Sequence, residues 1–203
     1  MRHRCTRPEH ETSRWQAFSL IVLAFASVAP LPAFAGWELD PSHTHVSFQV
    51  GHLGLSQTPG IFRKVDARMN FDDKNIEASS VTITIDAASI DTVSAERDAG
   101  LRGADWFDTV KYPSITFAST AVRRVDDKHY VISGNMTIRG TTLPVDFSTV
   151  LTNRTTNPFI KVPMVGFYGN AKIKRSDFGL TQYPAVISDE VDLKIVIELL
   201  QKP

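Results

Sequence analysis

Short runs in which hydrophobic and polar residues alternate dominate the chain after its first 35 residues. In residues 80–86, Val81, Ile83 and Ile85 share one side while threonines take the other, as a β-strand with one buried face requires. The same period predicts further strands at residues 45–50, 62–71, 115–123, 130–138, 144–151, 166–174 and 191–200. About eight strands with no strand–helix–strand rhythm predict an antiparallel barrel or sandwich that forms one domain.

One segment departs from this pattern and has helical spacing. Ala99, Leu101, Trp106 and Phe107 recur at roughly helical intervals, with charged residues between them. Pro113 ends the segment, because the residue before a proline is pushed out of the α region. We expect a single helix, inserted between two strands, that covers an opening of the barrel as a lid.

The start of the chain has the pattern of an export signal. A basic stretch is followed by an apolar run at residues 18–28, which is too short to span a bilayer, and by the small-residue site Ala33-Phe34-Ala35. This pattern predicts a signal peptide over residues 1–35, a mature barrel domain over residues 36–203 that begins at Gly36, and a location in the periplasm. An uncleaved membrane anchor is the alternative interpretation.

Charge and cysteine content exclude several functions. The chain has 22 basic and 22 acidic residues, of which four arginines and two glutamates lie in the signal, so 18 and 20 remain after cleavage. Such a balance gives no support for nucleic-acid binding. Cys5 is the only cysteine and lies in the signal, so the mature chain lacks a disulfide and a thiolate metal site. No later segment is apolar and long enough to be an integral membrane span.

A series of short motifs carries a resemblance to a known family. In chain order they are Trp37-Glu38-Leu39-Asp40-Pro41-Ser42-His43, His52-Leu53-Gly54, Ser89-Ile90-Asp91-Thr92, Asp105-Trp106-Phe107-Asp108, Lys111-Tyr112-Pro113, Thr137-Ile138-Arg139-Gly140 and Arg175-Ser176-Asp177-Phe178-Gly179-Leu180. With these motifs, nearly all of the mature chain resembles the YceI-like family. The resemblance implies an all-β, eight-stranded antiparallel lipocalin-like barrel with one inserted α-helix covering it. It also implies a bound isoprenoid or other long-chain lipid and, since family members are often dimeric, a homodimer.

Two further interpretations of the sequence concern turns. Residues 56–62, in which a proline precedes a glycine, are interpreted as a turn. Arg175 is interpreted as a lock for the turn around Asp177, Phe178 and Gly179 rather than as a ligand contact.

The inward-facing positions of the predicted strands and the apolar side of the helix make up the candidate site for a lipid tail. Periodicity cannot distinguish a filled interior from an empty one, so only the resemblance turns these core positions into the lining of a tunnel. The candidates are Phe48, Val50, Ile83, Ile85, Leu101, Trp106, Phe107, Phe117, Met136, Phe147, Phe167 and Ile195.

Four polar residues are candidates for binding the lipid head group: His43, His52, Arg97 and Arg102. The resemblance places the two histidines near the barrel mouth or in structural turns, and for His43 a role in turn bonding is an equal alternative. A guanidinium can donate paired hydrogen bonds to a pyrophosphate or a quinone oxygen; the alternative for both arginines is an ion pair with a nearby aspartate. A metal site built from His43, His45 and His52 is not expected, because no carboxylate follows at ligand spacing.

The sequence lacks the usual catalytic motifs. It contains no G-x-S-x-G elbow, P-loop or dinucleotide fingerprint, and its paired aspartates fall in expected turns. We therefore expect no enzyme and no cofactor besides the lipid. The hypothesis is a periplasmic protein that transports, stores or scavenges a long-chain isoprenoid. Two alternatives stay open: a stress-response protein in which the lipid is a structural filler, and an enzyme that acts on a barrel-bound lipid.

Overall fold

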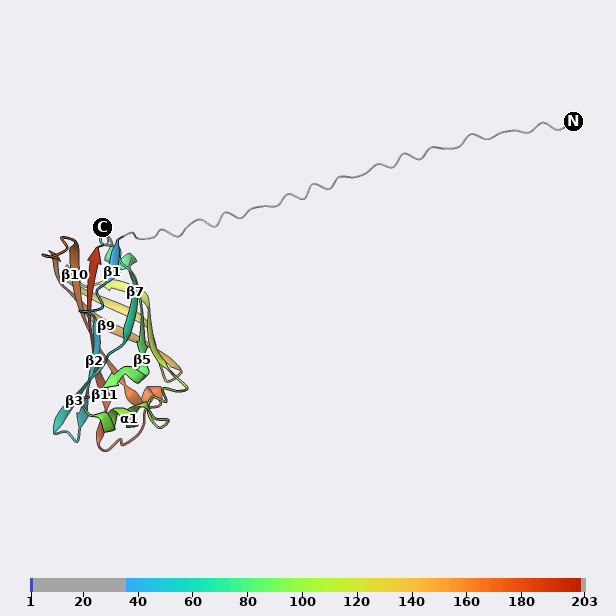
Figure 1. Ribbon diagram of the computed structural model, residues 1–203, viewed down its shortest axis with the longest axis vertical. Coiled ribbons are helices and arrows are strands. Elements are labelled where there is room, and N and C mark those ends of the chain that lie inside the picture. Colours follow the sequence, from blue (N-terminus) through green and yellow to red (C-terminus); the bar gives the residue numbers. More distant parts are fainter. Residues whose placement is uncertain (2–35, 202–203) are drawn as a thin grey trace. The chain divides into compact units, whose positions relative to one another are not determined.

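Hydrogen bonding between strands sets the fold in the computed structural model, which describes Met1 and residues 36–201. Within these residues the strands are β1 (Trp37–Leu39), β2 (His45–His52), β3 (Ser56–Phe62), β4 (Val65–Asn70), β5 (Ser80–Asp86), β6 (Ile90–Asp91), β7 (Ser114–Arg124), β8 (His129–Ile138), β9 (Thr141–Thr156), β10 (Pro163–Lys174) and β11 (Ile187–Gln201). The helices are α1 (Ala95–Arg102) and the short 3-10 turns η1 (Ile76–Ala78), η2 (Ala87–Ser89) and η3 (Arg175–Phe178) (Figure 1). The predicted signal peptide and its cleavage site lie outside the described residues.

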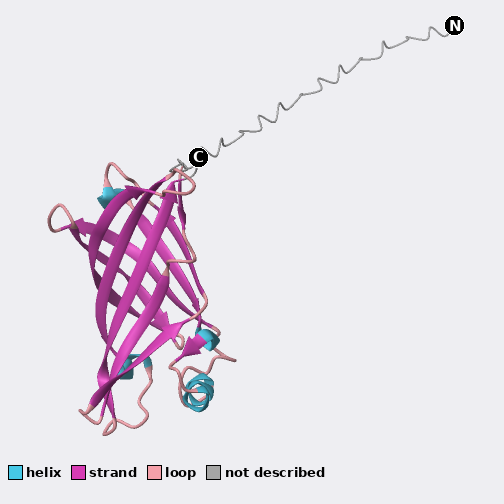
Figure 2. Ribbon diagram, turned by 60° about the vertical axis from the view of Figure 1, so that its left-hand side comes forward, coloured by secondary structure: helices cyan, strands magenta, loops and turns pink. Residues whose placement is uncertain are grey.

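The strands form one antiparallel sheet that curls into a barrel (Figure 2). Neighbours follow the order β4-β5-β7-β8-β9-β10-β11-β2-β3-β6, and β1 pairs with β11. No ladder joins β4 to β3 or β6 within residues 36–201, so the barrel has a seam between the two ends of this order. The chain itself crosses the seam at Arg63 and Lys64, between the end of β3 and the start of β4.

Alternation along the strands places the hydrophobic core inside the barrel. On β5, Val81, Ile83 and Ile85 are buried, whereas the threonines between them are exposed. The antiparallel lipocalin-like barrel is therefore confirmed. The number of strands is wrong, because the described residues form eleven strands in this sheet rather than eight.

Residues 56–62, interpreted from the sequence as a turn, form strand β3. Pro59 fits there because, among residues 36–201, β3 pairs with β6 only at Ile61 and Phe62, which leaves the other side of the strand at Pro59 without a ladder partner in this part of the chain. Gly60 fits because the Phe48 ring of the neighbouring strand lies across it: a Cβ at this position would be 2.2 Å from Phe48 Cζ. Pro59 and Gly60, which suggested a turn, are thus explained by the edge position of β3 and by the packing of the Phe48 ring.

The inserted helix is shorter than its sequence pattern indicates. Ser94 caps the start of α1 by accepting a hydrogen bond from the backbone N–H of Arg97, and α1 ends at Arg102, followed by Gly103. Trp106 and Phe107 therefore lie in the turns after α1 and not on it. α1 lies at the end of the barrel opposite β1 and the C-terminal end of β11 (Figure 1).

Candidate functional site

A cavity of about 670 Å³, the main cavity, occupies the interior of the barrel next to α1. Every candidate tail residue except Phe167 lines it. For the candidates on β2, β5, β7, β8, β9 and β11 this follows from the period of two along a strand, whereas Leu101, Trp106 and Phe107 reach the cavity from α1 and the turns after it. These lining residues are Phe48, Val50, Ile83, Ile85, Leu101, Trp106, Phe107, Phe117, Met136, Phe147 and Ile195. The structure thus brings them together around one largely apolar space, and their contact with a lipid stays a prediction.

Phe167 lines a second cavity of about 40 Å³, the small cavity. On β10 it pairs with Leu151 and Ile197, and its ring packs edge to face against Phe71 at a centroid distance of 5.5 Å. Phe167 does point into the barrel, as its alternation predicts, but further from α1 than the other candidates. Position along the barrel axis is the information that a pattern of period two does not contain.

Aromatic side chains pack against one another at the α1 end of the main cavity. Phe107 packs edge to face on Phe62 with centroids 6.1 Å apart, and Trp106 stacks on Tyr183 at 6.3 Å with an interplanar angle of 25°. We call Trp106, Phe107 and Tyr183 the cover. Tyr183 was not a candidate from the sequence, because it lies in the loop between η3 and β11, where no periodic pattern exists.

Arg175 fixes the loop that carries Tyr183. Its side chain is buried, lines the main cavity, and donates hydrogen bonds to the backbone carbonyls of Leu180, Ile187 and Ser188. Its guanidinium also lies over the Trp106 ring, 5.9 Å from the centroid. Arg175 therefore locks a turn, as interpreted from the sequence, and it does so through hydrogen bonds to backbone carbonyls.

The two arginine candidates have different surroundings. Arg97 lines the main cavity, and Thr92 holds its guanidinium by accepting from Nε at Oγ1 (2.7 Å) and from Nη2 at the backbone carbonyl (2.6 Å). Arg102 does not line the main cavity. It donates from Nε to the Ala88 carbonyl at 2.7 Å and from Nη2 to the Ile90 carbonyl at 2.9 Å, which ties α1 to η2 and β6.

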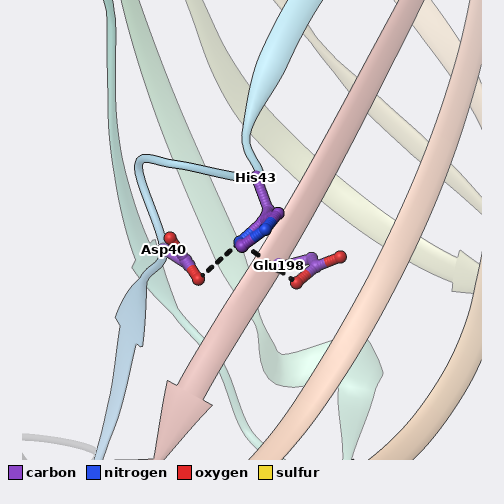
Figure 3. A group of neighbouring side chains, drawn as sticks. All are labelled: Asp40, His43 and Glu198. Atoms are coloured by element: carbon purple, nitrogen blue, oxygen red, sulfur yellow. Dashed lines mark hydrogen bonds and ion pairs between the residues drawn. The ribbon is translucent and has the colours of Figure 1, made fainter.

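The two histidine candidates lie at opposite ends of β2. His52 lines the main cavity, whereas His43 precedes β2, which extends for roughly 23 Å at a rise of 3.3 Å per residue. His43 Nδ1 lies 2.9 Å from Asp40 Oδ2 and 3.8 Å from Glu198 Oε2 (Figure 3). One head group cannot contact both histidines, and the turn bonding considered for His43 is what the structure shows.

Electrostatics around His43 follow from these contacts. The hydrogen bond to the Asp40 carboxylate, with the negative charges of Asp40 and Glu198, raises the pKa of His43 above its usual value. The same hydrogen bond is the main cause that lowers the pKa of Asp40. Ligand atoms of Asp40, His43 and Glu198 lie within 4.8 Å of one another, but Asp40 also accepts from the Ser42 backbone N–H at 2.9 Å. Turn hydrogen bonding therefore accounts for this cluster.

Another histidine–carboxylate pair, Asp126 and His129, lies at the start of β8. Backbone N–H donation from Lys128, followed by the hydrogen bond from the His129 ring, lowers the pKa of Asp126 to about 2. Neither this pair nor the pair of Asp40 and His43 lines the main cavity.

None of the helices within the described residues has the length and hydropathy that a membrane crossing demands.

Comparisons with known proteins agree with this architecture. The family model of the YceI-like domain matches residues 37–199. Protein YceI of Escherichia coli O157:H7 is 38% identical over 189 residues, which cover 91% of this chain and 98% of that protein. The crystal structure of Burkholderia cenocepacia BcnA matches with a TM-score of 0.72 and 27% identity, over 79% of this chain and 99% of that chain. A polyisoprenoid binding domain from Saccharophagus degradans matches with a TM-score of 0.61 and 14% identity, over 82% and 98%, and so shares the fold.

Proposed function

Because this chain belongs to the YceI-like family, we propose that its main cavity binds the tail of a long-chain isoprenoid or a similar amphiphilic lipid. The observation that carries the proposal is the main cavity itself, about 670 Å³ of space lined mostly by aliphatic and aromatic side chains from nine strands, α1 and the loops at the α1 end. A large apolar pocket with a few polar groups is the usual form of a small-molecule site. The S. degradans domain adds that a barrel of this fold is used for polyisoprenoid binding in another protein.

Burial of the tail supplies the free energy of binding in this proposal. Each methylene that leaves water for the cavity contributes about 0.8 kcal/mol. Ten buried carbons would contribute roughly 8 kcal/mol before the costs of ordering and association. The tail therefore needs no strong polar anchor, and selection of the head group can be loose.

The polar side chains at the α1 end suit the head group. Thr92, Ser94, Glu96 and Arg97 line the main cavity there. Thr92 already holds Nε and Nη2 of Arg97, so the guanidinium is oriented before a ligand arrives and Nη1 is the nitrogen that would donate to a head-group oxygen. Arg97 is thus the arginine that we assign to the head group, and Arg102 is assigned to the attachment of α1.

We place this binding in the periplasm, on the strength of the export signal in residues 1–35. There the protein would carry, store or scavenge its lipid. The lining of the main cavity is mostly apolar, which supports binding of the lipid rather than chemistry on it.

Mass spectrometry of organic extracts from protein purified from its own host tests the proposal, with a blocked cavity as reference. Val50→Trp would put an indole into the main cavity, which Val50 lines, whereas Gln49→Trp adds the same side chain to the opposite face of β2. We expect a long-chain lipid with the wild type and Gln49→Trp, and much less with Val50→Trp. Lipid-free wild type, or equal lipid in both variants, would contradict the proposal.

A further inference from the structure

A layer of four side chains separates the main cavity from the small cavity. Ile83, Phe117, Phe147 and Ile195 line both cavities. They come from β5, β7, β9 and β11, and all four are buried. Phe117, Phe147 and Ile195 come from alternate strands, as the side-chain layers of closed sheets do, and Ile83 lies opposite Phe117 on the paired strand β5. We call this layer the partition.

The partition is held in place by close packing. The rings of Phe117 and Phe147 meet edge to face, with centroids 5.1 Å apart and an interplanar angle of 78°, a preferred aromatic geometry. A Cβ at Gly134 of β8 would lie 2.4 Å from Phe117 Cζ, and one at Gly169 of β10 would lie 2.8 Å from Ile195 Cγ2. The glycines on the intervening strands therefore provide the space that the partition side chains fill.

The small cavity beyond the partition is as apolar in character as the main cavity. Phe71, Phe167 and Ile197 line it, and its volume is about 40 Å³. A hydrocarbon tail would be as compatible with this space as with the main cavity. The rings of Phe117 and Phe147 stand between the two, so a tail that fills the main cavity meets them first.

We propose that the partition limits the length of the tail that the barrel accepts, with Phe117 and Phe147 as the specificity-determining residues. The inference rests on the proposed function, because it takes the ligand of the main cavity to have a long apolar tail. It also explains how Phe167 can point into the barrel and yet contact no tail while the partition is intact.

The test measures the affinity of linear isoprenoid alcohols that differ by single isoprene units. Each additional buried methylene should tighten binding about fourfold before ordering costs, until the main cavity is full, after which the affinity stops rising. In Phe117→Ala, the rise should continue for at least one more isoprene unit, because the tail can enter the small cavity. Phe147→Ala should act in the same direction and provides the test if Phe117→Ala does not fold.

Phe167→Ala is the matched control, since it removes an equally buried phenylalanine that lines the small cavity alone. It should leave the length limit unchanged. A limit that stays at the wild-type length in both partition variants, or one that shifts equally in Phe167→Ala, would overturn the role of the partition.

A parallel series of straight-chain alcohols separates this inference from the proposed function. If the wild type binds straight chains but no isoprenoids, and Phe117→Ala extends the limit for straight chains, the partition is supported and the isoprenoid ligand is not. A wild type that binds neither series contradicts both.

Discussion

The cover of the main cavity can be tested at Trp106, whose ring stacks on Tyr183 and lies beneath the guanidinium of Arg175. A tail that leaves through the α1 end has to separate these groups. Trp106→Ala removes the stack and the cation–π contact together. We therefore expect the variant to keep its β-rich circular dichroism and to release a bound lipid faster.

The size of the effect follows from the two contacts. An aromatic pair contributes about 0.5–1.5 kcal/mol beyond its burial, and a cation–π contact about 0.5–2 kcal/mol. Since 1.4 kcal/mol corresponds to a factor of ten, release would accelerate between roughly fivefold and several hundredfold. Because Tyr183 is 62% exposed, the lower end of this interval applies. Related complexes differ mostly in off-rate, so the rate of entry should change less.

A fluorescent polyene lipid, released into excess unlabelled lipid well below the melting range, provides the assay. Tyr183→Ala should accelerate release by a smaller factor, because it removes the stack alone, and the double variant should exceed Trp106→Ala only slightly. Phe159→Ala removes an exposed aromatic from the loop between β9 and β10 and should have no effect. If release by Trp106→Ala is unchanged while the melting temperature falls, Trp106 is a core residue and the ligand leaves by another route.

Three further predictions concern other parts of the chain. Phe117→Asp would bury a carboxylate without a partner at a cost of several kcal/mol, so the barrel should unfold or lose its lipid; an unchanged melting temperature with unchanged lipid content would contradict this. The raised pKa of His43 contributes stability that is complete below the usual value of 6.5 and is lost as the pH rises through the raised pKa. The lowered pKa of Asp40 contributes stability that is lost as the pH falls below the usual value of 3.8. His43→Gln should therefore melt below the wild type at about pH 6 and approach it at about pH 8, and a constant difference between the two melting curves would argue against the ion pair. Ala35→Trp should leave the exported precursor uncut, and an intact mass of the wild type that retains residues 1–35 would exclude the predicted signal peptide.

Residues on regular strands were the predictable part of the fold and of the site. Ile83, Phe117 and Ile195 face the interior because their strands alternate, and alternation is a local property of the sequence. Two glycines mark the limits of such reasoning. Gly103 follows the last residue of α1, although the apolar spacing continues to Phe107, and Gly60 belongs to a strand because a ring from β2 needs its space.

The composition of the site was less predictable, because it depends on which strand ends share one end of the barrel. His43 and His52 are close in sequence but flank opposite ends of β2. Arg97 and Arg102 share a helix, yet only Arg97 faces the main cavity. Tyr183 joins Trp106 across a long sequence separation, which no periodic pattern reports.

The seam is the one part of the barrel wall, within residues 36–201, that strand pairing does not close. Around the rest of the wall, ladder hydrogen bonds tie each strand to its neighbour, and the circumference cannot grow without breaking them. Across the seam, within residues 36–201, the chain crosses at Arg63 and Lys64, again through η2 between β5 and β6, and a third time through α1 between β6 and β7. Arg63 adds a side-chain tie by donating from Nε to Asp91 Oδ2 at 2.6 Å, and β1 packs against β4. Between these connections, a wider separation of the two edges would disrupt side-chain packing but would break no ladder of strand hydrogen bonds.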